Sequence, residues 1–148
     1  MPTASPVAVT PTCKAAGLAA RITLWDHGAG HAMASVEVTN KGAAACRMPA
    51  VDKAQLVDGH GSVIIDGAAP PASSEVHLGP GTVLKTLVED SNYCGQTPDP
   101  PVTVAFVFPD GLTRFVATPL SATDASGVPP CNGAPGTPGD IEMQPWGP

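Results

Sequence analysis

Aromatic residues make up only 4% of this 148-residue chain, and lysine and arginine together number only 7. A core with so few aromatic side chains must be built mainly from Val, Leu, Ile and Ala. The net charge of −6 and the absence of any basic run argue against nucleic-acid binding. No apolar run approaches the length needed to span a membrane, so we expect no membrane span.

Paired cysteines of the CxxC type are also missing, and no His/Cys spacing typical of zinc sites is present. The four cysteines are widely separated, which favours disulfides and an oxidising compartment. Four cysteines allow three connectivities. We favour sequential pairing, because each bridge then ties a loop to a nearby strand end. The predicted bridges are Cys13 with Cys46 and Cys94 with Cys131.

Alternating apolar and polar residues predict short strands throughout the chain. The clearest run is 32–39, where Ala32, Ala34, Val36 and Val38 share one face. In the first predicted strand, Leu18, Ala20, Ile22 and Leu24 share a face, and Trp25 lies opposite. The most hydrophobic strand is 102–108, which predicts a central position in its sheet. Further strands are expected at 51–57, 62–65, 75–78, 82–89, 112–118 and 141–146.

About eight short strands separated by turn residues, with no convincing helix, are typical of a β-sandwich. We therefore predict an all-β, immunoglobulin-like β-sandwich with two disulfides, and a small β-barrel is the alternative. Residues 1–12 are rich in Pro, Ser, Thr and Ala and are expected to be a flexible linker. Residues 13–148 are expected to form a single domain.

An ordered set of short motifs links the chain to a known family. It comprises the four cysteines, Gly30-His31, residues 36–42 (Val-Glu-Val-Thr-Asn-Lys-Gly) and residues 78–81 (Leu-Gly-Pro-Gly). From about Cys13 to Trp146 the chain resembles domain of unknown function 4232, a family of secreted and lipid-anchored proteins, mainly of actinobacteria. The resemblance implies an extracellular β-sandwich, either secreted or held at the cell surface by a lipid anchor. It implies no catalytic residues.

Two small groups of residues are candidates for binding sites. His31 and Met33 lie two apart in a strand and so point the same way, where imidazole and thioether could share copper(I), with His27 and Met48 as further ligands. The alternative is that both side chains have structural roles only, and we favour this alternative. Trp25 and Trp146 could stack on sugars or anchor a partner, whereas packing within the sandwich is the commoner role of such residues.

No motif in the chain indicates catalysis. The serines lack a GxSxG turn, the cysteines are assigned to disulfides, and the aspartates lie mostly at turns without a calcium-binding run. We therefore expect no enzyme activity and no cofactor. The predicted function is a non-catalytic extracellular or cell-envelope module that binds an unknown protein or envelope component. An extracytoplasmic copper-binding protein is the alternative, and an envelope hydrolase is a weaker one.

Overall fold

The computed structural model describes residues 10–49, 53–68 and 75–148 of the chain. These residues form a short 3-10 helix, η1 (Ala15–Gly17), and ten strands. In chain order the strands are β1 (Leu18–Gly28), β2 (His31–Asn40), β3 (Cys46–Met48), β4 (Lys53–Val57), β5 (Val63–Asp66), β6 (Val76–Leu78), β7 (Val83–Ser91), β8 (Thr103–Val107), β9 (Arg114–Val116) and β10 (Asp140–Met143). The predicted all-β class is confirmed.

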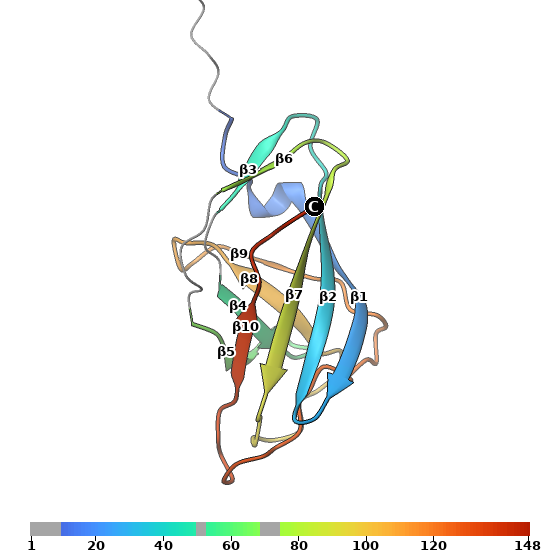
Figure 1. The fold of residues 1–148 in the computed structure, drawn as a ribbon, viewed down its shortest axis with the longest axis vertical. Coiled ribbons are helices and arrows are strands. Elements are labelled where there is room, and N and C mark those ends of the chain that lie inside the picture. The colour runs from blue at the N-terminus through green and yellow to red at the C-terminus, as the bar shows by residue number, and fades with distance from the viewer. Residues whose placement is uncertain (1–9, 50–52, 69–74) are drawn as a thin grey trace, which may run out of the picture.

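Two four-stranded antiparallel sheets lie face to face around one apolar core (Figure 1). The first sheet has the strand order β1-β2-β7-β10, and the second has the order β5-β4-β8-β9. A two-stranded ladder of β3 and β6 lies at the end of the molecule where the described chain begins (Figure 1). The fold is therefore an immunoglobulin-like β-sandwich, as predicted, and not the closed barrel of the alternative.

Strands β2 and β8 supply the centre of the core. In β2 every second residue is buried, because successive side chains of a strand point to opposite faces. The buried residues are those that the alternation predicts. In β8 all five residues are buried, which agrees with the predicted central position of this strand.

Strand β1 departs from its predicted alternation near its middle. Leu18, Ala20 and Ile22 face the core as expected. A register shift between Ile22 and Leu24 then changes the phase of the strand relative to β2. As a result Leu24 is 54% exposed and Trp25 is 7% exposed. The prediction that Leu24 shares the core face and that Trp25 lies opposite is therefore wrong.

Two short elements were not predicted, namely η1 and β3, since three residues are too few to show a period. Arg47 of β3 also pairs with the end of the predicted linker. The Arg47 backbone N–H donates to Pro11 (2.8 Å), and the Cys13 N–H donates to the Arg47 carbonyl (2.9 Å). Residues 1–9 of the linker, and positions 51 and 52 of the predicted strand 51–57, lie outside the described residues.

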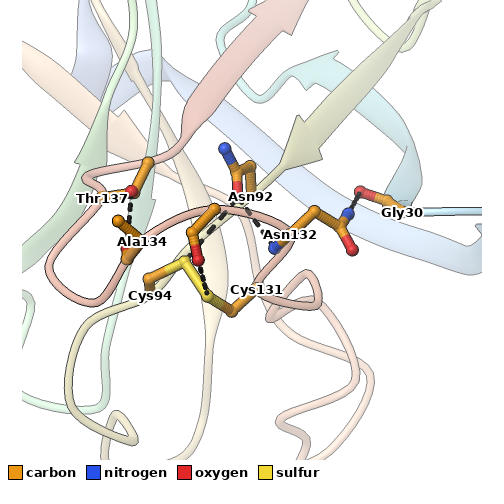
Figure 2. The surroundings of a disulfide bond; sticks show 8 residues. Gly30, Asn92, Cys94, Cys131, Asn132, Ala134 and Thr137 are labelled. Carbon is orange, nitrogen blue, oxygen red and sulfur yellow. Dashed lines mark hydrogen bonds between the residues drawn. A yellow bond between two sulfur atoms is a disulfide. The ribbon is translucent and has the colours of Figure 1, made fainter.

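The two disulfides join Cys13 to Cys46 and Cys94 to Cys131, which confirms the sequential pairing. The first ties the start of the domain to β3. The second ties the loop after β7 to the loop before β10 (Figure 2).

Asparagine side chains brace the second disulfide. Asn92, whose φ of 58° lies in the left-handed region, accepts a hydrogen bond on Oδ1 from the Asn132 N–H (2.9 Å). The side-chain amide of Asn132 donates from Nδ2 to the Gly30 carbonyl in the β1–β2 turn (3.4 Å; Figure 2). Two chain segments and a hairpin turn are thereby held together at this end of the sandwich.

The chain beyond β10 remains attached to β7 and re-enters the core. Gln144 N–H donates to the Leu87 carbonyl (3.0 Å), and Gly147 exchanges two backbone hydrogen bonds with Lys85. Between them Trp146 is 6% exposed, and its ring centroid lies 4.9 Å from that of Phe106. Aromatic packing at this distance is favourable beyond the area it buries, so Trp146 anchors the C-terminal segment.

The free edge of β1 is covered at one point by the chain that leaves β9. The Thr118 N–H donates to the Ala20 carbonyl (2.8 Å), and the Ile22 N–H donates to the Thr118 carbonyl (2.9 Å). The segment after β9 thus passes from the edge of the second sheet to the edge of the first.

Replacing a fully buried valine of β8 by aspartate should unfold the domain. Val104→Asp places an unpaired carboxylate in the core, which should cost about 4 kcal/mol or more. Val116→Asp on the neighbouring strand β9 is the matched control, because Val116 is exposed, and it should change stability by only about 0.5 kcal/mol. Urea unfolding followed by circular dichroism measures both. A Val104→Asp protein as stable as the control would contradict the position assigned to β8.

A thiol reductant should open the second disulfide of the folded protein first. Cys131 is exposed, whereas Cys13 is buried and shields its bridge from attack by a thiolate. Timed alkylation with peptide mass spectrometry should detect labelled Cys94 and Cys131 before labelled Cys13 and Cys46. In urea, where both bridges are accessible, the difference should shrink. Earlier labelling of Cys13 in the folded protein would refute this expectation.

Candidate functional site

The outer face of the first sheet carries a row of hollows. Strand β7 lies in the middle of this face between β2 and β10, so its outward side chains form a floor. Those side chains are Lys85, Leu87, Glu89 and Ser91. Three hollows of about 450, 120 and 220 Å³ follow one another along them.

Shared lining residues show that these hollows are neighbours along β7. The first and second hollows share Leu87 and Gln144, and the second and third share Glu89 and Glu142. We call the whole depression the β7 furrow. It is lined by Thr23, Met33, Ser35, Val36, Glu37, Lys85, Thr86, Leu87, Glu89, Ser91, Asp140, Glu142, Met143, Gln144, Pro145 and Gly147.

The charge of the furrow changes along its length. At one end Lys85 lies opposite Glu37, which forms an exposed ion pair with Arg21 (3.0 Å). At the other end Glu142 and Asp140 of β10 accompany Glu89, and none of the residues lining this part is basic. Leu87 separates the two ends. The furrow is therefore of mixed charge at one end, apolar in the middle and acidic at the other end.

The acidic end includes a pair of like charges directly across two strands. Glu89 and Glu142 are register partners, and like charges in this position destabilise a sheet by about 0.2–1 kcal/mol. The nearest cationic candidate is His31, whose Nδ1 lies 3.8 Å from Glu89 Oε1. The acidic end of the furrow thus carries negative charge that its own strands do not neutralise.

One wall of the furrow is the C-terminal segment that follows β10. Thr86 donates its hydroxyl to the Gln144 carbonyl (2.6 Å), in addition to the backbone hydrogen bonds of Gln144 and Gly147 with β7. Because Trp146 is held in the core behind this wall, the position of Gln144 and Pro145 is fixed from inside the sandwich.

Directly behind the acidic end, Asp90 points into the core. Its side chain is 1% exposed, and neither carboxylate oxygen has a hydrogen-bond partner. Burial, with a smaller contribution from the adjacent Glu89 charge, raises the pKa of Asp90 to about 8, although the nearby Ala32 N–H favours the ionised form. The Asp90 carboxyl is therefore protonated over much of the pH range in which other aspartates are ionised.

The structure does not bring the predicted copper ligands together. His31 and Met33 both lie on the outer face of β2, as expected from their spacing. Met48 is fully buried in β3, and the His27 ring lies 2.6 Å from the Ser126 carbonyl in another loop. Within residues 10–49, 53–68 and 75–148, no three His, Cys, Asp or Glu side chains are arranged to hold a metal ion.

Both tryptophans considered as exposed binding residues are buried. Trp25 packs on Gly127, where a Cβ atom would overlap the indole ring, and Trp146 packs against Phe106 and Phe115. Neither indole therefore offers a free face on which a sugar could stack.

Sequence reasoning missed the furrow and Asp90. The furrow depends on which residues of β2, β7 and β10 lie side by side, and this register is not visible in one strand's pattern. The burial of Asp90 could have been predicted, because Asp90 is an even number of residues from Leu84 and Val88 and therefore points to the same, buried face of β7.

A family model described as Domain of unknown function (DUF4232) matches residues 13–147. The chain belongs to this family. The match spans both sheets, both disulfides and the whole furrow of this DUF4232 domain. No curated protein and no solved structure matches it. Among the described residues of the DUF4232 domain, no helix is long and apolar enough to cross a membrane.

Reversing one charge of the like-charge pair should stabilise this DUF4232 domain. Glu142→Lys places a cation opposite Glu89 and should raise the free energy of unfolding by about 0.5 kcal/mol at low salt. The gain should shrink at 1 M salt, where charges are screened. Glu142→Gln, which only removes the repulsion, should give a smaller gain. Urea titrations of the three proteins provide the measurement, and a destabilised Glu142→Lys protein would contradict the paired geometry.

Proposed function

We propose that this DUF4232 domain is a non-catalytic binding module outside the cytoplasm, and that it holds an extended polypeptide segment of a partner protein in the β7 furrow. The observation that carries the proposal is the row of three neighbouring hollows along the outer face of β7. Their floor is a strand paired on both sides, so the binding surface is already formed before a ligand arrives.

The dimensions of the furrow suit a segment rather than a compact small molecule. Its largest hollow, about 450 Å³, lies within the range of about 300–1,000 Å³ that is usual for ligand sites. The row of hollows extends past Glu89 to Ser91. Ser91 is six residues along β7 from Lys85, so the row covers about 20 Å of strand. An extended chain of several residues would occupy this length.

The chemistry of the lining favours polypeptide over glycan. No aromatic side chain lines the furrow, so sugar rings would find no stacking surface there. Met33 and Leu87 instead give an apolar contact area, and methionine adapts its shape to varied side chains. Ser35 and Gln144 add hydrogen-bonding groups beside it.

A location outside the cytoplasm, whether secreted or held at the cell surface, forms part of the proposal. The two disulfides support it, because such bridges form and persist in oxidising compartments and are rare in reducing ones. They also brace the domain at both of its ends, which suits a module that must stay folded without cellular quality control.

A randomised 12-residue peptide library displayed on phage tests the function. After selection on the parent domain, the enriched peptides are synthesised and their binding is measured by NMR and calorimetry. We expect shifted amide signals at Ser35, Leu87 and Gln144. Leu87→Arg, which fills the furrow with a longer charged side chain, should weaken binding at least tenfold.

Val116→Arg is the matched control, since Val116 is an exposed strand residue of the other sheet. It should leave the affinity within about twofold of the parent. Peptides that shift signals of β9 instead, or that bind Leu87→Arg as well as the parent, would refute the furrow as the binding site. Failure to enrich any peptide would refute the proposed polypeptide ligand.

A further inference from the structure

Asp90 is the only charged side chain that is buried among residues 10–49, 53–68 and 75–148. It lies on the core face of β7, in register with Ala32 of β2 on one side and Ile141 of β10 on the other. Both of these neighbours are apolar. Neither carboxylate oxygen makes a hydrogen bond, and the Ala32 N–H is the one nearby donor that favours the ionised form, so ionisation in this position carries a large cost.

In the part of the chain that the structure describes, the core-facing positions of β2 and β10 beside Asp90 carry no charged side chain. The charged or titratable side chains next to it along these strands point to the opposite, outer face of the sheet: His31 on β2, Glu89 on β7, and Asp140 and Glu142 on β10. The facing sheet presents apolar core residues such as Ile65, and the charged side chains of its strands lie outside the buried set. The negative charge of ionised Asp90 can therefore be relieved only by access to water.

Strand β10 is the neighbour of Asp90 that can move most easily. Its ladder with β7 covers four residues and is continued by the hydrogen bonds of Gln144 with Leu87 and Thr86, whereas β2 pairs with β7 over nine residues and also with β1. The other edge of β10 lies near β4 and β5 but forms no ladder with them. The core contact of β10 comes from Ile141, which is buried, and from Met143, which is partly buried.

Both ends of the segment that contains β10 are fixed. The disulfide of Cys131 with Cys94 holds one end, and Trp146 packed against Phe106 holds the other. Between them Gly136 and Gly139 have φ values of 84° and 83°, which glycine adopts without strain. We call residues 132–145 the strap.

We propose that the strap stays closed against β7 only while Asp90 is protonated, and that loss of the Asp90 proton releases the strap while the rest of the sandwich stays folded. When the strap lifts, the carboxylate reaches water. The released proton goes to solvent, and no other group is required to accept it.

The dependence on pH follows from the difference between the two states. In the closed state burial raises the pKa of Asp90 to about 8, whereas in the open state a hydrated aspartate has the ordinary value of about 3.9. Closure is therefore most stable at low pH and weakens as pH rises. Between about pH 4 and pH 8, each unit should raise the ratio of open to closed strap about tenfold.

Release of the strap would also change the β7 furrow, because Glu142 and Gln144 of the strap line it. This consequence rests on the proposed function, whereas the release itself does not. A ligand that needs both walls of the furrow would bind more tightly at pH 5.5 than at pH 7.5.

Hydrogen exchange of the ligand-free domain tests the release. Amide exchange is measured between pH 5.5 and 7.5 and corrected for the intrinsic rate at each pH. The corrected exchange of Asp140–Met143 should rise about tenfold per pH unit, and that of β8 should not. In Asp90→Asn, which keeps the shape but cannot ionise, the slope should disappear. Asp140→Asn removes a charge from the outer face of β10, and its exchange should show the same slope as that of the parent.

The proposal would be overturned by a flat profile in the parent or by a slope retained in Asp90→Asn. An equal slope in β8 would also overturn it, because it would indicate unfolding of the whole domain. If Asp90→Asn fails to fold, NMR titration of the Asp90 side-chain carbon in the parent decides. A midpoint well above the ordinary range supports the proposal, and an ordinary midpoint overturns it. Since no ligand is present, these results are independent of whether a peptide binds the furrow.

Discussion

The pairing of β2 with β7 is the constraint on which the rest of this sandwich depends. It joins His31 to Ser91 at one end and Thr39 to Val83 at the other without interruption. Because side chains alternate along both strands, this one register decides which residues face the core and which face out. The same alignment places the apolar residues of β2 in the core and the furrow residues of β7 on the outer face. A slip by one residue would exchange them and place Asp90 on the surface.

Much of this arrangement could be predicted from the sequence, because it reflects local period. The alternation of residues 32–39 and the hydrophobic run of 102–108 gave the two central strands in their observed positions. The disulfide pairing followed from strand ends that neighbour each other in a sandwich. The prediction failed where the alternation of β1 changes. The register shift between Ile22 and Leu24 turns Trp25 toward the core, and no residue type in this stretch indicates such a shift. Strand β3 is too short to show a period at all.

The candidate site was much less predictable than the fold. His31 and Met33 were singled out because they are chemically distinctive, and they do lie at the outer face of β2. The furrow itself is made of ordinary residues such as Leu87 and Gln144, which come from distant parts of the chain. Only the register of three strands and the return of Trp146 into the core bring them together. A surface of this kind leaves no motif, since its shape depends on tertiary packing rather than on reactive groups.

The contact of Thr118 with β1 has a consequence for how copies of this domain behave at high concentration. An uncovered edge strand offers a row of free N–H and C=O groups, on which another chain can add a strand. Here the carbonyl of Ala20 and the N–H of Ile22 are already occupied by Thr118 of the same molecule. A second molecule would have to displace this segment before it could extend the sheet. The crossing between the two sheets therefore acts as a built-in guard against edge-to-edge aggregation at the middle of β1.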